Sequence, residues 1–232
     1  RWENLGLSFE PRNIKDVIHD SDLNLDLKKI TNPENPEILI AGCGTGQHAI
    51  TTASKYKKSK ILALDLSFKS LSYAKRKANE LEIDNIDFIQ GDILDLESID
   101  RKFDIIESVG VLHHMKNPLR GWKILTSCLN NDSLMLIGLY SEKARQHITY
   151  IKDKIDKLRL HSSYSNIVKF RKDLIEHNND KWNDIKSSPD FYTLSGVRDL
   201  LFHVQEHRFT ISKIKKNLDK LGLFFLGFDD KL

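Results

Sequence analysis

The sequence of 232 residues predicts an α/β fold with a doubly wound, parallel sheet, and three observations carry that prediction. An apolar run over residues 38–41 leads directly into three glycines at alternate positions, Gly42, Gly44 and Gly46. A second apolar run ends in Asp65, 23 positions after Gly42. Finally, stretches typical of strands and of helices alternate over residues 37–140, which favours parallel strands joined by crossover helices.

The glycine loop separates the first predicted strand from a predicted helix over residues 47–56. Because glycine has no Cβ, the loop backbone can approach a ligand closely at the N-terminus of that helix. An acidic residue about 20 positions further on binds ribose hydroxyls in Rossmann-type folds, and Asp65 stands there. We therefore expect a cofactor that contains a nucleoside. The dinucleotide pattern G-x-G-x-x-G has Gln47 in place of its last glycine, which disfavours a nicotinamide-dependent oxidoreductase.

The remaining elements of the alternating region follow in order. Ser67 is a suitable N-cap for a helix over residues 68–81, whose apolar residues recur at helical spacing. Pro118 suits the first position of a later helix. The predicted strands are 86–90, 103–108 and 134–140, and the predicted helices are 68–81 and 118–129. Gly91, Asp92 and Ile93 follow the third strand, and residues 109–115 follow the fourth.

Four features occur in this order: the glycine loop, Asp65 at the end of the second strand, residues 91–93, and the fourth strand with the segment that follows it. Together they resemble the class I S-adenosylmethionine-dependent methyltransferases, which have a Rossmann-like sheet. The resemblance implies that S-adenosylmethionine is the cofactor, that Asp65 binds its ribose, and that Asp92 and the Ile93 amide bind its adenine. The alternative is a structural glycine turn with solvated acids. The cofactor-binding residues implied by the resemblance are Gly42, Cys43, Gly44, Gly46, Asp65, Leu66, Asp92, Ile93, Ser108 and Val109.

Four segments are expected along the chain. Residues 1–36 form an N-terminal helical segment with candidate helices at 13–19 and 25–30, and residues 37–140 form the cofactor-binding core. Residues 141–205 contain no convincing strand and form a helical insertion after strand five, which the resemblance identifies as a substrate cover. Residues 206–232 complete the core with a helix at 211–221 and a strand at 223–228. The whole chain resembles the catalytic segment of bacterial tetratricopeptide-repeat methyltransferases, although no repeat is visible.

No catalytic base can be assigned from the pattern, but several side chains are candidates. His113 and His114 follow the fourth strand; alternatively, one packs over the adenosine and the other caps the local turn. Tyr140 ends the fifth predicted strand, and the alternative is a rim aromatic with a hydrated hydroxyl. Arg145 suits a substrate carboxylate or phosphate, unless it is a solvated surface residue. The further candidates are Tyr164, Tyr192 and His207.

Residues 203–207 spell H-x-x-E-H, which formally matches a zinc-binding pattern. On a helix, His203 and His207 would share one face, yet no third ligand is evident, and we expect no metal. Two other interpretations stay open. Either this segment lies at the substrate entrance, or Glu206 has a structural role and is hydrogen-bonded to His207 or Arg208.

Composition narrows the class of function. A net charge of +3, from 36 basic and 33 acidic residues, does not favour nucleic acid as a partner. The longest apolar stretches have the length of strands, so no membrane span is expected. Cys43 and Cys128 are too few for a disulfide framework, which fits a reducing, cytoplasmic setting. The chain begins at Arg1 rather than Met, which leaves room for an upstream segment.

The expected function is methyl transfer from S-adenosylmethionine to a small polar metabolite. The alternative within this fold is methylation of a protein or peptide side chain. A nicotinamide-dependent oxidoreductase and a cofactor-binding module that has lost catalysis are the alternatives from other classes.

Overall fold

The computed structural model describes residues 5, 7, 10, 12–19, 32–56, 58–176, 182–203 and 205–229. The chain divides into two compact units. The first, here called the sheet unit, comprises Arg1–Leu139 and Ser212–Leu232, and the second, the helical unit, comprises Tyr140–Ile211.

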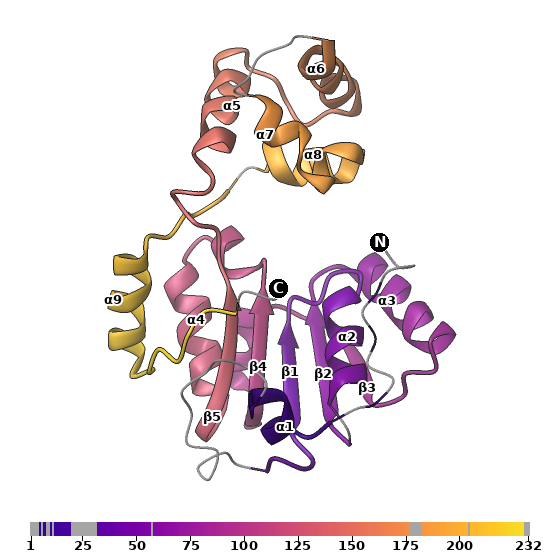
Figure 1. Ribbon diagram of the computed structural model, residues 1–232, viewed down its shortest axis with the longest axis vertical. Helices are drawn as coiled ribbons and strands as arrows, with labels where there is room; N and C mark the ends of the chain where they lie inside the picture. The colour runs from indigo at the N-terminus through magenta and orange to yellow at the C-terminus, as the bar shows by residue number, and fades with distance from the viewer. Residues whose placement is uncertain are drawn as a thin grey trace. The chain divides into compact units, whose positions relative to one another are not determined.

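The sheet unit is built on five parallel strands in the order β3-β2-β1-β4-β5 (Figure 1). Their bounds are Glu37–Ala41 (β1), Lys60–Asp65 (β2), Ile86–Gln90 (β3), Phe103–Val109 (β4) and Leu129–Gly138 (β5). The chain order reverses at β1, which has β2 on one side and β4 on the other. In open α/β sheets, ligands bind at the carboxyl ends of the strands beside such a reversal. The predicted doubly wound, Rossmann-like fold is confirmed.

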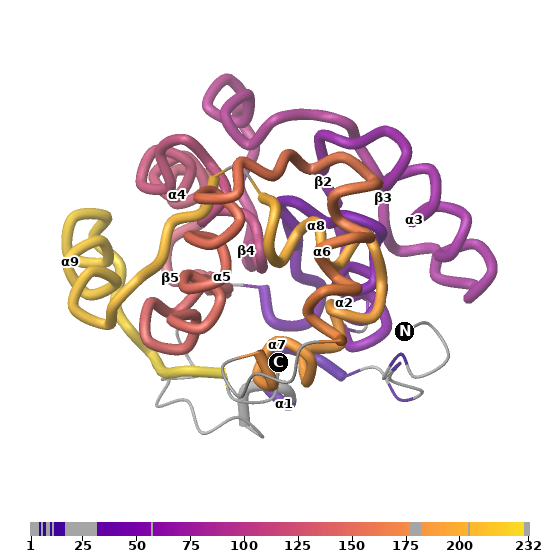
Figure 2. Tube along the Cα trace, turned by 90° about the horizontal axis from the view of Figure 1, so that it is seen from above, coloured from indigo at the N-terminus to yellow at the C-terminus, as the bar shows by residue number. Residues whose placement is uncertain are grey.

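Helices cover both faces of this sheet, because successive residues of a strand point to opposite sides. Ile38 and Ile40 of β1 belong to one apolar cluster, to which α1 (Ile14–His19), α2 (Gln47–Lys55) and α3 (Phe68–Glu80) contribute. Leu39 and Ala41 belong to the other cluster, with the 3-10 helix η2 (Ile93–Ser98), α4 (Pro118–Ser127) and α9 (Ile211–Leu221). Figure 2 shows the helices α3 and α4 on opposite sides of the strands.

The cap expected at Ser67 is confirmed, and a second helix begins with a cap at Asn117 that was not predicted. The Ser67 side chain accepts a hydrogen bond from the Ser70 amide at the start of α3. Asn117 does the same for the Arg120 amide at the start of α4, with Pro118 in the first helical position. These caps satisfy amides that have no partner within the helix.

Three sequence predictions need correction or fall outside the structure. The fifth strand begins at Leu129 and ends at Gly138, before Tyr140, with an irregular register where Asp132 has a φ of 54°. The strand predicted over residues 223–228 is wrong: residues 223–229 join no strand, and Phe224 is 89% exposed. An apolar run becomes a strand only when another strand pairs with it. The candidate helix at 25–30 lies outside the described residues.

The helical unit has an apolar core of its own. The elements of this unit are α5 (Gln146–Lys157), α6 (Tyr164–Glu176), α7 (Asn183–Lys186), the 3-10 helix η5 (Pro189–Tyr192) and α8 (Leu194–Leu201). Apolar side chains from all five elements form one buried cluster. The outgoing and returning ends of the unit pair with each other, since the Phe209 amide donates to the Tyr140 carbonyl at 2.9 Å and the Glu142 amide to the Phe209 carbonyl at 3.1 Å.

Within the described residues, no helix combines the length and the apolar character that crossing a bilayer requires.

Candidate active site

The glycine loop after β1 bends back onto the end of β2. The Gly42 and Cys43 amides both donate to the Leu64 carbonyl, at 2.8 and 2.9 Å. A Cβ on Gly42 would lie 2.3 Å from the Val111 side chain, and a Cβ on Gly46 would lie 2.6 Å from the Cβ of Ala74. Neighbouring segments therefore require these two glycines. A Cβ on Gly44 would meet nothing within 4 Å, so the loop leaves open space for a ligand there.

Asp65, at the end of β2, holds two loops with one carboxylate. Its Oδ2 accepts from the Gly44 amide at 2.7 Å, and its Oδ1 accepts from the Ser67 amide at 2.8 Å. Each carboxylate oxygen has capacity for a further hydrogen bond. The adjacent Leu66 and Phe68 are 66% and 68% exposed, which places an apolar surface beside the acid. A polar acceptor next to exposed apolar surface suits a nucleoside.

Asp92 begins the 3-10 helix after β3. Its Oδ1 accepts from the Leu94 amide at 2.9 Å, and its own amide donates to Asp95 Oδ2 at 3.4 Å. This reciprocal pair is a capping box, for which the spacing of Asp92 and Asp95 in the sequence was an available signal. Ile93 is buried directly after it. Asp92 therefore has a structural role whether or not it contacts a ligand.

The end of β4 is tied to β1 by a buried side chain. The Ser108 hydroxyl is fully buried and donates to the Ala41 carbonyl at 3.0 Å, which ties β4 to β1. Because Ser108 has no exposed surface, the contact with the cofactor that the resemblance implies at this residue stays a prediction. Val109 follows it and is half-buried.

The two histidines after β4 lie in different environments. His113 is fully buried, whereas His114 is half-buried. Both belong to the 3-10 turn η3 (Leu112–His114), and their ring centroids are 4.2 Å apart. Of the two candidates, His114 is the one with solvent access.

Cys43, within the loop, is not a nucleophile. Burial, together with the nearby Asp65 carboxylate, raises the pKa of the Cys43 thiol to about 12. The thiol therefore stays protonated at neutral pH, and a protonated thiol reacts poorly.

A buried carboxylate under the glycine loop escaped the sequence analysis. Glu107 of β4 is 5% exposed, and its Oε2 lies 2.7 Å from the donating Thr52 Oγ1 and 2.8 Å from His48 Nε2. The available signal was an acidic residue inside an otherwise buried strand, which demands a partner. His48 and Thr52 are four positions apart on α2 and share one face of that helix, so both can reach Glu107.

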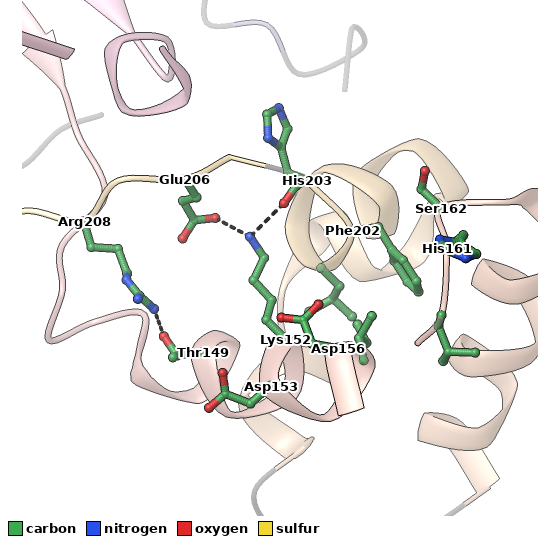
Figure 3. Close-up of a pocket in the computed structure, with 13 residues that line it drawn as sticks. Thr149, Lys152, Asp153, Asp156, His161, Ser162, Phe202, His203, Glu206 and Arg208 are labelled. Atoms are coloured by element: carbon green, nitrogen blue, oxygen red, sulfur yellow. Dashed lines mark hydrogen bonds and ion pairs between the residues drawn. The ribbon is translucent and has the colours of Figure 1, made fainter. Parts of the chain in front are cut away.

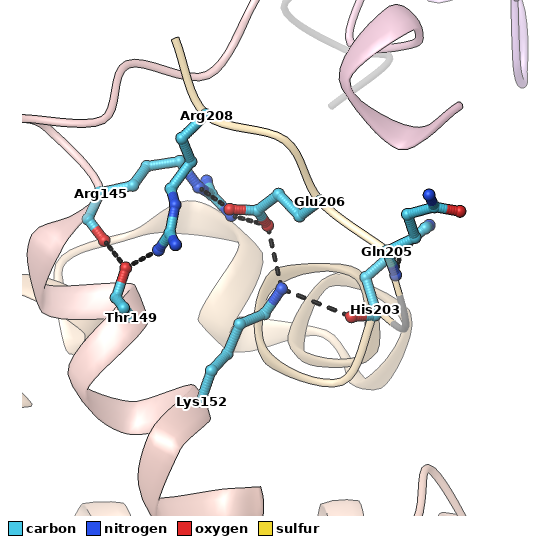
Figure 4. Close-up of polar contacts among 7 residues, drawn as sticks. All are labelled: Arg145, Thr149, Lys152, His203, Gln205, Glu206 and Arg208. Carbon is cyan, nitrogen blue, oxygen red and sulfur yellow. Dashed lines mark hydrogen bonds and ion pairs between the residues drawn. The ribbon is translucent and has the colours of Figure 1, made fainter. Parts of the chain in front are cut away.

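In the helical unit, Glu206 forms a largely buried cluster with two cations (Figure 4). Arg145 Nε and Nη2 each donate to one oxygen of Glu206 at 3.0 Å, and Lys152 Nζ donates to Oε2 at 3.0 Å. Burial alone would raise the pKa of Glu206, but these hydrogen bonds outweigh burial and hold it below its usual value. Glu206 is thus a hydrogen-bonded structural group, as one of the two interpretations had it, but its partners are Arg145 and Lys152 and not His207 or Arg208. Arg208 instead donates to Thr149 Oγ1.

The helical arrangement that the H-x-x-E-H pattern needs is not formed. Helix α8 ends at Leu201, and residues 203 and 205–208 are not helical. His203 Nδ1 accepts from the Gln205 amide at 3.3 Å, while Glu206 binds Arg145 and Lys152. In the part of the chain that the structure describes, no group of three His, Cys, Asp or Glu side chains could hold a metal ion.

Comparison with known proteins assigns the family. A family model described as "Methyltransferase domain" matches residues 34–221. The chain belongs to this family. The resemblance to class I S-adenosylmethionine-dependent methyltransferases is thereby confirmed. Membership of this family argues against the alternative of a nicotinamide-dependent oxidoreductase. The finer likeness to tetratricopeptide-repeat methyltransferases stays a prediction.

Individual relatives cover different parts of this methyltransferase domain. The uncharacterized protein syc1184_c of Synechococcus sp. is 29% identical over 204 residues, 84% of this chain and 49% of the relative. The probable (S)-tetrahydroprotoberberine N-methyltransferase 2 of Papaver bracteatum is 32% identical over 119 residues, 51% of this chain and 33% of the relative. PKMT2 of Rickettsia typhi, solved with AdoHcy, has the same fold, with a TM-score of 0.65 and 22% identity over 90% of this chain and 43% of that chain. The chain thus spans half or less of the length of these relatives.

The helical unit of the methyltransferase domain also contains a pocket of about 470 Å³ beside Glu206 (Figure 3). Its lining includes both signs of charge, from Lys152 and Arg208 on one hand and Asp153 and Asp156 on the other. Ile155 and Phe202 add apolar surface. A pocket of this kind suits a polar molecule of small size.

The remaining candidates in this unit are not gathered at one point. Tyr140 lies under the Arg145 guanidinium, whose carbon is 3.6 Å from the ring centroid, and burial raises the pKa of the Tyr140 hydroxyl although Arg145 opposes this. Tyr164 and Tyr192 are 67% and 66% exposed. His207 Nε2 lies 3.5 Å from Gln205 Nε2. Tyr140 is thus the candidate that contacts the Arg145–Glu206 pair, through the Arg145 guanidinium.

Proposed function

We propose that this chain is an S-adenosylmethionine-dependent methyltransferase that acts on a small polar acceptor. The observation that carries the proposal is the loop-and-acid arrangement at the sheet edge: open space at Gly44, joined by a hydrogen bond to Asp65. The family assignment supports methyl transfer as the reaction.

The residues of the sheet edge fit this cofactor in type and in position. The open loop at Gly44 and the first turn of α2 suit the carboxylate of the cofactor, because α2 begins without a side-chain cap and without an acid in its first turn. Asp65 would accept the ribose hydroxyls, and Asp92 and Ile93 would meet the adenine. The remaining proposed contacts are the loop residues Gly42, Cys43 and Gly46, the apolar Leu66, and the two residues that end β4, Ser108 and Val109.

The bound cofactor supplies an activated methyl group, since its sulfonium is a good leaving group. The work left to this chain is to orient the acceptor, to exclude water and, where needed, to accept a proton. In the sheet unit, His114 is the candidate for the proton because it is half-buried whereas His113 is fully buried. Cys43 is unsuited to it while its thiol stays protonated.

The helical unit is proposed to select the acceptor. Its pocket of about 470 Å³ presents charged groups of both signs, which can orient a polar molecule. Two relatives are named for small-molecule substrates, the (S)-tetrahydroprotoberberine and (S)-coclaurine N-methyltransferases, and they favour a small acceptor here as well. The cytoplasmic location expected from the presence of only two cysteines in the sequence stays a prediction.

A binding titration followed by a transfer assay tests this function. Calorimetry with S-adenosylmethionine, S-adenosylhomocysteine and NAD should show binding of the first two and not of NAD. Transfer of a labelled methyl group is then measured into the small-molecule and the protein fractions of a cell extract. Label in the small-molecule fraction supports the proposal, whereas label in protein alone supports side-chain methylation. NAD binding without binding of either adenosyl compound would refute the cofactor.

A further inference from the structure

Glu107 is a buried acid on the central part of the sheet. It lies in register with Ile40 of β1 and Leu136 of β5. Its strand neighbour Ile105, two positions earlier on the same face, belongs to the apolar cluster under α2. A carboxylate in such surroundings is stabilised only when cationic or hydrogen-bonding groups compensate for its lost hydration.

Both of its partners come from α2. His48 Nε2 lies 2.8 Å from Glu107 Oε2, at ion-pair distance, and Thr52 Oγ1 donates to the same oxygen at 2.7 Å. The side chain of His48 is 29% exposed and that of Glu107 only 6%. The third titratable group nearby is Tyr56, at the end of α2, where burial and then the Glu107 charge raise the pKa of the hydroxyl, so it stays neutral. His48 is therefore the group at ion-pair distance from Glu107 that is able to carry a positive charge.

The position of His48 connects this pair with the glycine loop. It is the second residue of α2, and the helix follows Gly46 without a side-chain cap. The partial positive charge of a helix N-terminus favours an anion. A negative charge buried beneath the same turn opposes that anion, and low polarity weakens the screening between them.

We propose that His48 and Glu107 form a positioning pair, in which His48 neutralises the buried carboxylate so that the first turn of α2 can hold the carboxylate of the cofactor. This inference rests on the proposed function. Thr52 fixes the orientation of Glu107 and leaves the charge balance to His48.

Charge variants separate this role from simple packing. His48→Gln removes the cation and leaves Glu107 uncompensated, so it should weaken S-adenosylmethionine binding about tenfold, the scale of a charge acting at a partly buried helix end. Glu107→Gln removes the opposing charge and should bind at least as tightly as the native chain. The double variant, neutral at both positions, should recover affinity to within about threefold of native.

The matched ligand is decarboxylated S-adenosylmethionine, which differs only in lacking the carboxylate. Its affinity should change less than about twofold in all three variants, because the proposal concerns that carboxylate alone. Calorimetry with both ligands, together with the melting temperature of each variant, gives the comparison.

Three results would overturn the inference: equal losses for both ligands, a double variant as weak as His48→Gln, or selective weakening of S-adenosylmethionine in Glu107→Gln. If His48→Gln does not fold, Glu107→Gln decides alone, on whether it keeps native affinity for S-adenosylmethionine. A native chain that binds neither ligand refutes the proposed function itself, and the inference with it.

Discussion

The Gly44 amide donates to Asp65 Oδ2 at 2.7 Å, so the glycine loop after β1 and the acid that ends β2 form one unit. The contact spans 21 positions of sequence. It brings the two features that predicted a nucleoside cofactor into direct contact, at the strand ends where ligands bind in this class of sheet.

Replacement of Asp65 by Ala should weaken S-adenosylhomocysteine binding by about 1.5–3 kcal/mol, the scale of hydrogen bonds to a charged group. Calorimetry measures it, with the exposed Asp84→Ala as control. Unchanged affinity in a folded Asp65 variant would remove this residue from the site.

Gly44→Ala and Gly46→Ala should separate binding from stability. At Gly46 a methyl group would lie 2.6 Å from the Cβ of Ala74 with φ at +90°, so the melting temperature should fall. At Gly44 the methyl group meets no neighbouring atom, so the loss of stability is limited to the cost of the positive φ, about 1–2 kcal/mol. The same methyl group occupies the space proposed for the ligand. We expect the Gly44 variant to lose relatively more affinity than stability. The reverse order in thermal melts and titrations would contradict this assignment.

Acid should loosen the helical unit through Glu206. Because its folded pKa is lowered, its contribution to stability is present above the unfolded value of about 4.3 and is lost as pH falls through the folded value. The protection factors of the α5 amides, which correct for the slower intrinsic exchange in acid, should therefore fall at low pH in the native chain. Glu206→Gln should show faster exchange already at pH 7, whereas Glu176→Gln, at an exposed pair with Lys172, should not.

Substitution of Tyr164 or Tyr192 by Ala should lower turnover more than affinity for S-adenosylhomocysteine. Both side chains are mostly exposed, so the melting temperature should change little. Ile151→Ala, in the core of the helical unit, is the control that should lower it. Normal turnover with reduced melting temperature in the tyrosine variants would show that these residues only pack.

Exhaustive chelation should leave activity unchanged. His203 and His207 do not share a helix face, and Glu206 is held by Arg145 and Lys152. Stoichiometric zinc in elemental analysis that is lost in His203→Ala would restore the metal interpretation.

The sequence predicted the elements whose signals are local. Apolar runs of strand length, the Ser67 cap and the glycine spacing each specify a neighbourhood of a few residues, and the corresponding elements are present. The run at 223–228 misled for the same reason: its pattern is local, but a strand also needs a partner that the pattern cannot supply.

The polar contacts were less predictable because they join distant residues. Arg145 and Glu206 are 61 positions apart, and Thr52 and Glu107 are 55 apart. The sequence can indicate that an acid such as Glu107 needs a partner, but it does not say which distant residue supplies it. Only the fold brings them together, so the partners considered for Glu206 in the sequence were its neighbours His207 and Arg208, whereas Arg145 and Lys152 bind it.

The pairing of Phe209 with Tyr140 means that the helical unit begins and ends at nearly the same point. A segment with adjoining ends and its own apolar core can be exchanged as a block without altering strand β5 before it and helix α9 after it. In protein engineering, residues 140–211 are therefore a natural cassette: grafting the corresponding segments of other family members at the same two junctions, with the glycine loop and Asp65 kept, tests whether this unit selects the acceptor as we propose.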